Sequence, residues 1–527
     1  MELPRMCNLR FGLILAVFFS IVVYFLPHSN HGRIQSNLRQ FAQCASDKIH
    51  DVEGTTGEQD GKVYEHEHSQ PHEPIAVPTT LTATVTVTVA STVAAPSSIA
   101  TTTAFSDLPV EVLDVVDSPE YCSTRFGSGL LRALSERPVD YCDDGSSANL
   151  TCFSYHLHED RIKDSFCFGG PAFLDPIERI VRMDCGLKYY DEESGDKTMP
   201  PLDAFPEYGW METGPRVLFE RFIRTERDPR FEAVVKPKGF SFLVKREDNG
   251  FNMWHTMMQI MSLTLSLDVM RQTVDPNTGD PYFTEAEHER SRVVILDDLE
   301  DGPYLETWGL LSRLPIVRLR DIDVSAETEP TKIVVPLPGV ANPFWQGDWQ
   351  EVNCGESVLL HTFKRRVLDL HRIAAPPPRN GNNLTLTMID RHNRRRLLNK
   401  DQYFAKLQQR YPDITMQFVD FASLTFAEQL QIAHSTDILV GVHGAGLTHG
   451  MFLPPDSRII EILPAYFWHQ GFKNMAGFLG HKYFKRYADD VRGLGKVGDW
   501  QVEDVVVGEE EFLEVVREAV ESLGWRS

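Results

Sequence analysis

Clustered arginines are the first residues whose type and spacing suggest chemistry. Residues 389–396 (IDRHNRRR) follow an apolar run and contain four arginines. Arginine stays charged and presents paired N–H donors that match phosphate oxygens. We expect Arg391, at the end of a predicted strand, and one of the arginines at 394–396 to contact phosphate. A solvated basic turn is the alternative.

A glycine turn with a histidine offers a second group of phosphate-binding residues. His443, Gly444 and Gly446 lie between two predicted buried strands, and the second strand carries Glu461. Glycine lets the backbone approach an anion, and a helix start offers free N–H groups. An acid about twenty residues after such a glycine is placed for a ribose hydroxyl. The alternatives are a structural histidine and a buried, salt-bridged glutamate.

A histidine at the start of an apolar helix is the candidate general base. Residues 252–270 (NMWHTMMQIMSLTLSLDVM) predict a buried helix that Asn252 can cap, with His255 on the same side. Histidine near its ordinary pKa can accept a proton from a hydroxyl group. A lone histidine in a Met-rich helix is more often a hydrogen-bonded core residue, which is the alternative.

An acidic cluster after the predicted strand 292–296 is the candidate metal site. Asp297, Asp298, Glu300 and Asp301 could hold Mn²⁺ or Mg²⁺ through carboxylate oxygens. The chain has a net charge of −23, so acids are common throughout and an acidic loop is the preferred interpretation. Asp297 and Asp298 therefore stay a second choice. The same acidic balance argues against a nucleic-acid partner.

The elements that must hold these groups alternate between strands and helices in two stretches. Strands are predicted at 240–244, 292–296, 332–335, 384–389, 414–419, 437–442 and 458–463. Alternation of this kind favours parallel sheets. The segment 374–383 (AAPPPRNGNN) breaks the pattern and predicts a linker. We therefore expect an α/β fold with two facing Rossmann-like domains and a ligand in the cleft between them.

Composition sets the remaining boundaries. Residues 1–10 are expected to be a cytosolic tail, and the uncharged run 11–26 a transmembrane signal anchor rather than a cleaved signal peptide. Residues 27–105 are expected to form a Ser/Thr/Pro-rich stem. The domains then follow at 106–373 and 384–490, joined by the linker 374–383, and a tail with a closing helix occupies 491–527. Residues 106–236 show no assignable chemistry and are expected to be irregular.

Cysteines and glycosylation motifs favour an oxidising lumen. An even set of six cysteines follows the stem, which suits disulfides. The sequence contains no C-x-x-C pair, so a zinc site is not expected. These disulfide candidates, whose pairing is left open, are Cys122, Cys142, Cys152, Cys167, Cys185 and Cys354. Asn149 and Asn383 begin N-x-T glycosylation motifs.

Taken together, these motifs resemble the family 61 glycosyltransferases. The likeness rests on HGAGLTHGMFLP followed by IIEILP, with TMIDRHNRRRLLN, EQLQIAHSTDILVG and NMWHT upstream. It extends to the family's EGF domain-specific O-linked N-acetylglucosamine transferases. It covers 384–488 densely and 239–354 more loosely.

The resemblance implies a GT-B fold whose first domain binds the acceptor and whose second domain holds a UDP-sugar. It implies donor-binding roles for Arg391, Arg395, His443, Gly444, Gly446 and Glu461, and catalytic roles for Asn252 and His255. It also implies inverting transfer, most simply of N-acetylglucosamine from UDP-GlcNAc to a Ser/Thr hydroxyl, with no required cofactor although Mn²⁺ is possible.

Other functions stay open. Other family 61 members transfer xylose to glycans, and a tethered form with a long stem departs from the family's soluble, endoplasmic-reticulum-retained members. A nicotinamide-dependent oxidoreductase would share the glycine turn, but the spacing of Gly441, Gly444 and Gly446 is not G-x-G-x-x-G. A non-catalytic, stalked carbohydrate-binding protein would account for the stem and for Trp345 and Trp349, which could stack on sugar rings or simply pack. We expect a single-pass membrane protein of the Golgi or endoplasmic reticulum with its catalytic part in the lumen.

Overall fold

The structure is a computed structural model that describes residues 119–525 with gaps. The gaps are residues 137, 159–160, 189–200, 207–210, 228–230, 232–236, 238, 324–328, 377–382 and 494. The predicted cytosolic tail, anchor and stem (residues 1–105) lie outside the described residues, as do most of the predicted linker residues. None of the helices described between 119 and 525 is long and apolar enough to cross a membrane.

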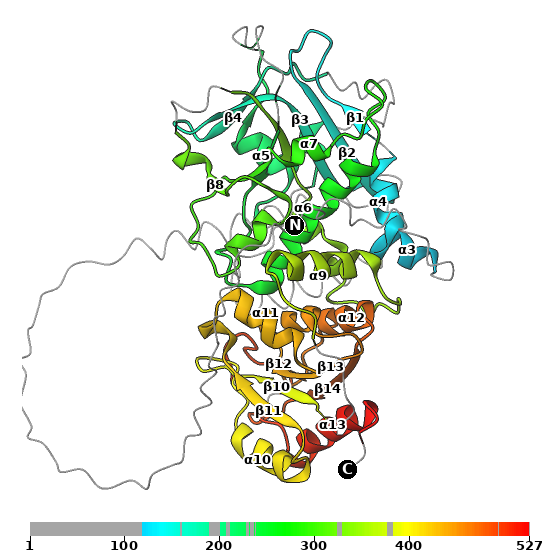
Figure 1. Ribbon diagram of the computed structural model, residues 1–527, viewed down its shortest axis with the longest axis vertical. Helices are drawn as coiled ribbons and strands as arrows, with labels where there is room; N and C mark the ends of the chain where they lie inside the picture. Colours follow the sequence, from blue (N-terminus) through cyan, green and yellow to red (C-terminus); the bar gives the residue numbers. More distant parts are fainter. Residues whose placement is uncertain are drawn as a thin grey trace, which may run out of the picture. The chain divides into compact units, whose positions relative to one another are not determined.

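The first sheet is mixed rather than parallel throughout (Figure 1). Its strands run in the order β1-β2-β3-β9-β6-β7-β8, with β4 and β5 paired beside β3. Strands β9, β6, β7 and β8 are parallel, whereas β1, β2, β3 and β9 pair in antiparallel fashion. The bounds are β1 Pro138–Asp140, β2 Asn149–His158, β3 Arg161–Asp175, β4 Ile180–Met183, β5 Ile223–Arg224, β6 Phe240–Val244, β7 Arg292–Ile295, β8 Val317–Arg318 and β9 Thr331–Val335.

This sheet corrects two predictions. Residues 106–236 are not irregular where they are described, because β2 and β3 form a long antiparallel hairpin with Cys152 opposite Cys167. The first domain is consequently not a purely parallel Rossmann-like sheet. The strands predicted at 240–244, 292–296 and 332–335 are confirmed as the parallel strands β6, β7 and β9, with ends that differ by at most one residue. A hairpin needs only a short turn between its strands. The sequence therefore lacks the alternation of strand and helix from which the other strands were predicted.

Helix α6, Met253–Gln272, belongs to the part of the chain built around the first sheet, called the first lobe; the second lobe is built around the second sheet. The helix is buried on nearly every side, as predicted. The side-chain oxygen of Asn252 accepts hydrogen bonds from the N–H groups of Trp254 and His255, so Asn252 caps this helix. The other helices of this lobe are α3 Glu120–Phe126, α4 Ser128–Ser135, α5 Pro215–Arg221, α7 Glu285–His288, α8 Pro343–Gln346 and α9 Val358–Leu370, with 3₁₀ turns η3 Leu202–Ala204, η6 Leu305–Leu311, η7 Leu319–Asp321 and η8 Gly339–Ala341.

The second sheet is fully parallel, in the order β11-β10-β12-β13-β14 (Figure 1). Its strands are β10 Thr385–Ile389, β11 Thr415–Val419, β12 Ile438–Val442, β13 Arg458–Leu463 and β14 Lys482–Tyr487. Its helices are α10 Lys400–Arg410, α11 Phe426–His434, α12 Gly471–Phe478 and α13 Glu509–Ser522, with 3₁₀ turns η9 Phe421–Ser423 and η10 Ala445–Phe452. Thr425 and Glu428 form a capping box at the start of α11. The sequence analysis assigned neither β14 nor α12.

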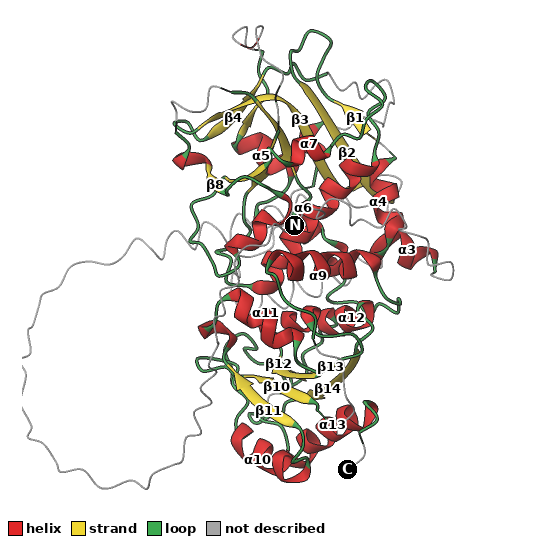
Figure 2. Ribbon diagram, in the orientation of Figure 1, coloured by secondary structure: helices red, strands yellow, loops and turns green. Residues whose placement is uncertain are grey.

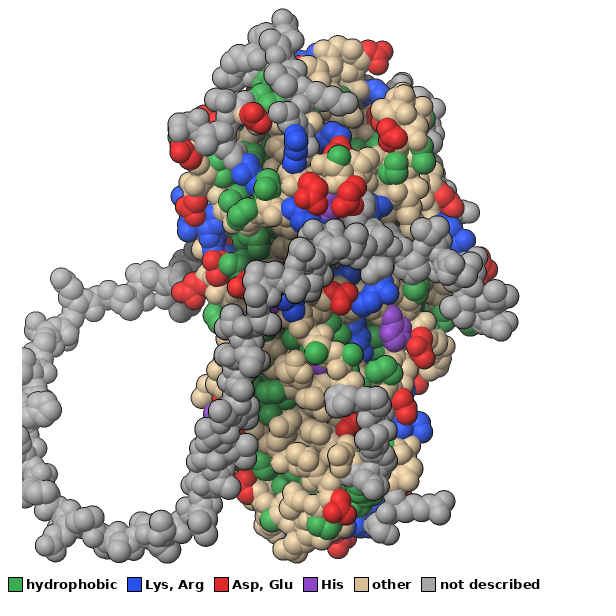
Figure 3. Space-filling view, viewed as in Figure 1, with side chains coloured by type: hydrophobic (Ala, Val, Ile, Leu, Met, Phe, Trp, Pro, Cys, Tyr) green, Lys and Arg blue, Asp and Glu red, His purple; other side chains and the backbone are tan. Residues whose placement is uncertain are grey.

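One apolar core joins the two lobes. It contains side chains from α6 and α9 of the first lobe and from α11, α12 and η10 of the second. Figure 2 shows α9, α11 and α12 between the two sets of strands. Polar contacts add to this core: Asn474 on α12 donates to the carbonyl oxygens of Gly347 (3.1 Å) and Gln350 (2.8 Å). On the outer surface, acidic and basic side chains are intermixed over the face drawn in Figure 3.

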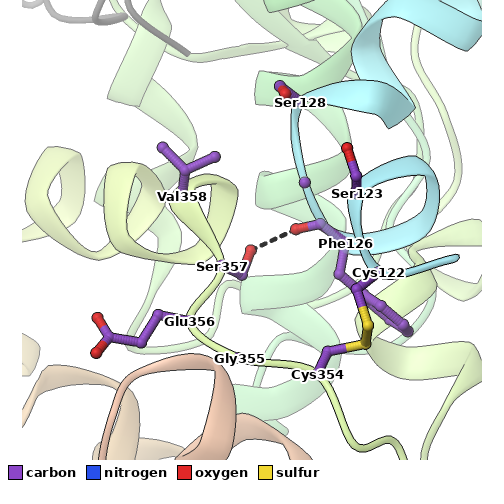
Figure 4. Close-up of a pocket in the computed structure, with 10 residues that line it drawn as sticks. Cys122, Ser123, Phe126, Ser128, Cys354, Gly355, Glu356, Ser357 and Val358 are labelled. Carbon is purple, nitrogen blue, oxygen red and sulfur yellow. Dashed lines mark hydrogen bonds between the residues drawn. A yellow bond between two sulfur atoms is a disulfide. The ribbon is translucent and has the colours of Figure 1, made fainter. Parts of the chain in front are cut away.

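The six cysteines form three disulfides. They join Cys142 to Cys185, Cys152 to Cys167, and Cys122 to Cys354. The last of these ties α3 to the segment before α9, where Ser357 also donates to the carbonyl oxygen of Phe126 at 2.5 Å (Figure 4). Asn149 and Asn383 are both exposed, and their glycosylation stays a prediction.

A buried ion pair between α6 and α9 gives a stability prediction. Arg366 donates to both carboxylate oxygens of Asp268 at 2.8 and 3.0 Å, and both side chains are 4% exposed. We expect Arg366→Ala to lower the free energy of unfolding by about 3–5 kcal/mol, because it leaves a buried charge without its main partner. Urea denaturation measures this. The adjacent Arg365 is exposed, so Arg365→Ala should cost no more than about 1 kcal/mol; equal losses would contradict the assignment.

Candidate functional site

The predicted glycine turn lies at the carboxyl end of β12, between β10 and β13 in the second sheet. Gly444 has φ +141°, a conformation that side-chain-bearing residues rarely adopt. A Cβ atom there would lie 2.5 Å from Nη1 of Arg395 and 2.9 Å from Nη2 of Arg391. Gly444 is therefore required for its backbone conformation and for the close approach of two guanidinium groups.

Arg391 and Arg395 bring two positive charges to this turn without a carboxylate partner. In the described part of the chain neither forms an ion pair, and the Nε atoms of both are buried without a hydrogen-bond partner. Burial lowers the pKa of Arg391, and burial together with the charges of Arg391 and Arg394 lowers the pKa of Arg395 to about 10. Two desolvated cations side by side repel each other, so the arrangement favours an anion bound between them.

The other two arginines of the cluster are more exposed. Arg396 pairs with Asp504 at 2.6 Å, and half of its side chain is exposed, while Arg394 is also exposed. The tertiary structure thus shows that Arg395, and not Arg394 or Arg396, lies against the glycine turn. The spacing of the residues alone could not distinguish among the three arginines.

His443 and Glu461 form a buried pair behind the turn. Nδ1 of His443 lies 2.6 Å from Oε1 of Glu461, and the Tyr483 hydroxyl donates to Oε2 at 2.5 Å. Burial lowers the pKa of His443, and Glu461 opposes that shift. Because both oxygens of Glu461 are engaged within the protein, its contacts match the salt-bridged alternative, and its role at a ribose stays a prediction.

His255 lies in the first lobe with two neighbours that fix its ring. Its Nδ1 is 2.8 Å from Oδ2 of Asp248, and its ring stacks on Trp345 at 4.3 Å between centroids. About a fifth (21%) of its side chain is exposed, so it is not the fully enclosed core residue of the alternative. The observed contacts of Asn252 are those of a helix cap, and its catalytic role stays a prediction.

Asp348 is a site residue that the sequence analysis missed. Its Oδ2 lies 3.6 Å from Nε2 of His469, whose ring is 4.6 Å from the ring of His443. Burial raises the pKa of Asp348, while His469, Trp254 and the charge of His255 act against the rise. Asp348 therefore stands between the His255 region and the glycine turn. Two flanking tryptophans, at 345 and 349, were the only signal in the sequence near it.

The acidic cluster after β7 is occupied by arginines. Asp297 accepts from Arg246 at 2.8 Å, and Asp298 pairs with Arg179 at 2.7 Å and with Arg320 at 2.5 Å. Carboxylates that already face guanidinium groups are poor ligands for a divalent cation. This geometry does not favour the second-choice metal site.

Comparison with known sequences places the chain in a family. The sequence model described as Glycosyltransferase 61 matches residues 196–460, which is half of the chain. The chain belongs to glycosyltransferase family 61. The matched region contains His255, both turn arginines and the glycine turn, and it ends one residue before Glu461.

Curated relatives agree with this assignment. The EGF domain-specific O-linked N-acetylglucosamine transferase of Drosophila melanogaster is 28% identical over 221 residues, covering 42% of this chain and 40% of the relative. The protein of the same name from Rattus norvegicus is 26% identical over 337 residues, covering 62% of this chain and 57% of the relative. The chain thus spans about half the length of these relatives.

The contacts at Gly444 give a binding prediction for this family 61 chain. We expect Gly444→Ala to weaken UDP binding at least about 10-fold, or 1.4 kcal/mol, because the methyl group displaces both guanidinium groups. Isothermal titration calorimetry measures the dissociation constant, and a melting curve checks the fold. Gly279 also has positive φ (+77°) but open space around its Cβ position, so Gly279→Ala is the matched control. Unchanged affinity in a folded Gly444→Ala protein would contradict the prediction.

Proposed function

We propose that the chain is an inverting glycosyltransferase that uses a UDP-sugar donor and a hydroxyl acceptor. The observation that carries the proposal is the pair of partly buried guanidinium groups, Arg391 and Arg395, held against Gly444 with no described carboxylate beside them. A diphosphate supplies the missing negative charge and matches arginine's hydrogen-bond geometry. The position at the carboxyl end of a central parallel strand is the usual place for a nucleotide.

In this mechanism the two lobes divide the chemistry. The arginines and the backbone after Gly444 stabilise the charge that develops on the departing UDP. His255 in the first lobe accepts the acceptor's hydroxyl proton. A single direct displacement inverts the anomeric carbon. A GT-B arrangement of the two lobes, with donor and acceptor bound between them, is part of this proposal.

The two arginines also make a metal ion unnecessary for leaving-group stabilisation, since they already supply two positive charges. We therefore propose metal-independent transfer. Mn²⁺ is the alternative, but Asp297 and Asp298 are poorly placed to hold it, because both already pair with arginines.

The sugar, acceptor and location are finer parts of the proposal. N-acetylglucosamine and a Ser/Thr hydroxyl are favoured because the matched relatives carry O-linked N-acetylglucosamine transfer in their names. The disulfides and the apolar run 11–26 support a lumenal enzyme with an N-terminal membrane anchor. Xylosyl transfer to a glycan is the alternative.

Donor hydrolysis and transfer test the proposal. UDP-GlcNAc, UDP-xylose and UDP-glucose are offered side by side, and we expect UDP-GlcNAc to give the fastest turnover.

We expect Arg395→Ala to raise the dissociation constant for UDP by about 10- to 100-fold, as loss of a charged hydrogen bond would, whereas Arg396→Ala should change it less than about 3-fold. Absence of both UDP binding and turnover in the wild-type protein would overturn the proposal.

The lowered pKa of His443 predicts how donor affinity depends on pH. The free protein holds His443 neutral near pH 7, and a diphosphate beside Nε2 would favour the imidazolium form. Binding then takes up a proton, so affinity for a UDP-sugar should rise as the pH falls from about 8 to about 6. Calorimetry with a UDP-sugar avoids titration of a terminal phosphate. His443→Asn should remove the slope; a slope that persists would exclude His443 as its source.

A further inference from the structure

The residue that orients His255 can be identified from its contacts. We propose that Asp248 is a positioning residue that fixes the tautomer of His255 and directs Nε2 of the ring at the acceptor hydroxyl. The inference rests on the proposed glycosyl transfer and adds to it a residue to which the sequence analysis assigned no role. Asp248 lies between β6 and α6, seven residues before His255.

The Asp248 carboxylate is itself held in place. Its Oδ1 accepts the N–H of Gly250 at 2.9 Å, and its Oδ2 lies 2.8 Å from Nδ1 of His255. Gly250 has φ +72°, a left-handed turn conformation that returns the chain toward α6. One oxygen therefore fixes the carboxylate to the turn, and the other remains for the imidazole.

The hydrogen bond decides which nitrogen of His255 is available. An ionised carboxylate only accepts hydrogen bonds, so Nδ1 must carry the hydrogen, which leaves the lone pair on Nε2. No described residue forms a hydrogen bond with Nε2. The stack on Trp345, 25° from parallel, and the capped backbone N–H of His255 restrict rotation of the ring.

Other acids near His255 are less suited to this role. Glu247 precedes Asp248, but burial raises its pKa to about 7, and its Oε1 is bonded to the N–H of Val340 at 3.1 Å. Asp348 interacts with His255 through its charge. However, Oδ2 of Asp348 faces His469, and Oδ1 lies against the backbone of Gly471, 2.4 Å from where a Cβ atom would be. Asp248 alone makes a direct bond to the ring among the described acids.

The transfer step balances without another reactant. The acceptor oxygen forms a bond to the anomeric carbon as Nε2 takes the hydroxyl proton. The bond from that carbon to the β-phosphate oxygen breaks, and its electron pair leaves with UDP. His255 becomes an imidazolium ion whose charge Asp248 stabilises across Nδ1–H, and the proton then passes to solvent.

Replacement of Asp248 tests this assignment in the full chain with the UDP-sugar that turns over. We expect Asp248→Asn to lower kcat about 100-fold, the lower end of general-base contributions, with the donor KM and the UDP-induced rise in melting temperature unchanged. Asp248→Glu should restore part of the lost kcat. The matched control is Asp280→Asn, which removes the same charge from an exposed turn of the first lobe and should leave kcat unchanged.

A double variant separates positioning from a merely structural role. If Asp248 acts through His255, Asp248→Asn adds no further loss of kcat to His255→Ala. Multiplicative losses in the double variant, or an unchanged kcat in Asp248→Asn, would overturn the inference. The proposed function would stand in that case as long as the wild-type protein binds UDP and transfers the sugar. Loss of UDP binding in the wild type would instead overturn the proposed function.

Discussion

The desolvation of two guanidinium groups is the constraint on which the rest of the site depends. Arg391 and Arg395 are drawn from water against the Gly444 turn, and no described carboxylate neutralises them. Folding must tolerate this unfavourable charge, and an anionic ligand removes it. The parallel sheet sets the geometry, because β10 and β12 are neighbours and deliver the arginines and the glycine turn to the same edge.

The second constraint is the connection between the lobes. The segment before α9 carries Trp345, which stacks on His255, and Asp348, which faces His469 of the second lobe. Asn474 hydrogen-bonds to the backbone of the same segment, and the disulfide from Cys354 anchors its end to α3. One short stretch of chain therefore touches both the candidate base and the surroundings of the proposed donor site, which couples their positions.

The accuracy of the sequence-based predictions differs between the two lobes for a physical reason. In the second lobe, continuous apolar strands separated by helices determine a parallel sheet, and the predicted bounds of β13 are reproduced. In the first lobe, the β2–β3 hairpin and its neighbours gave no such alternation. Strand pairing there depends on contacts with β9, more than 150 residues away in sequence from β3 (Cys167 opposite Val335), and local patterns do not encode partners at that distance.

The sequence by itself determined residue types: a basic cluster, a glycine turn and a capped helix with a histidine, in an order that resembles family 61. The tertiary structure decided which of these side chains meet. It selected Arg395 over Arg396, turned Glu461 toward His443, and brought Asp248 to His255. Local sequence sets backbone conformation and periodicity, whereas the direction of a side chain and its burial follow only from packing between elements that are distant in the chain.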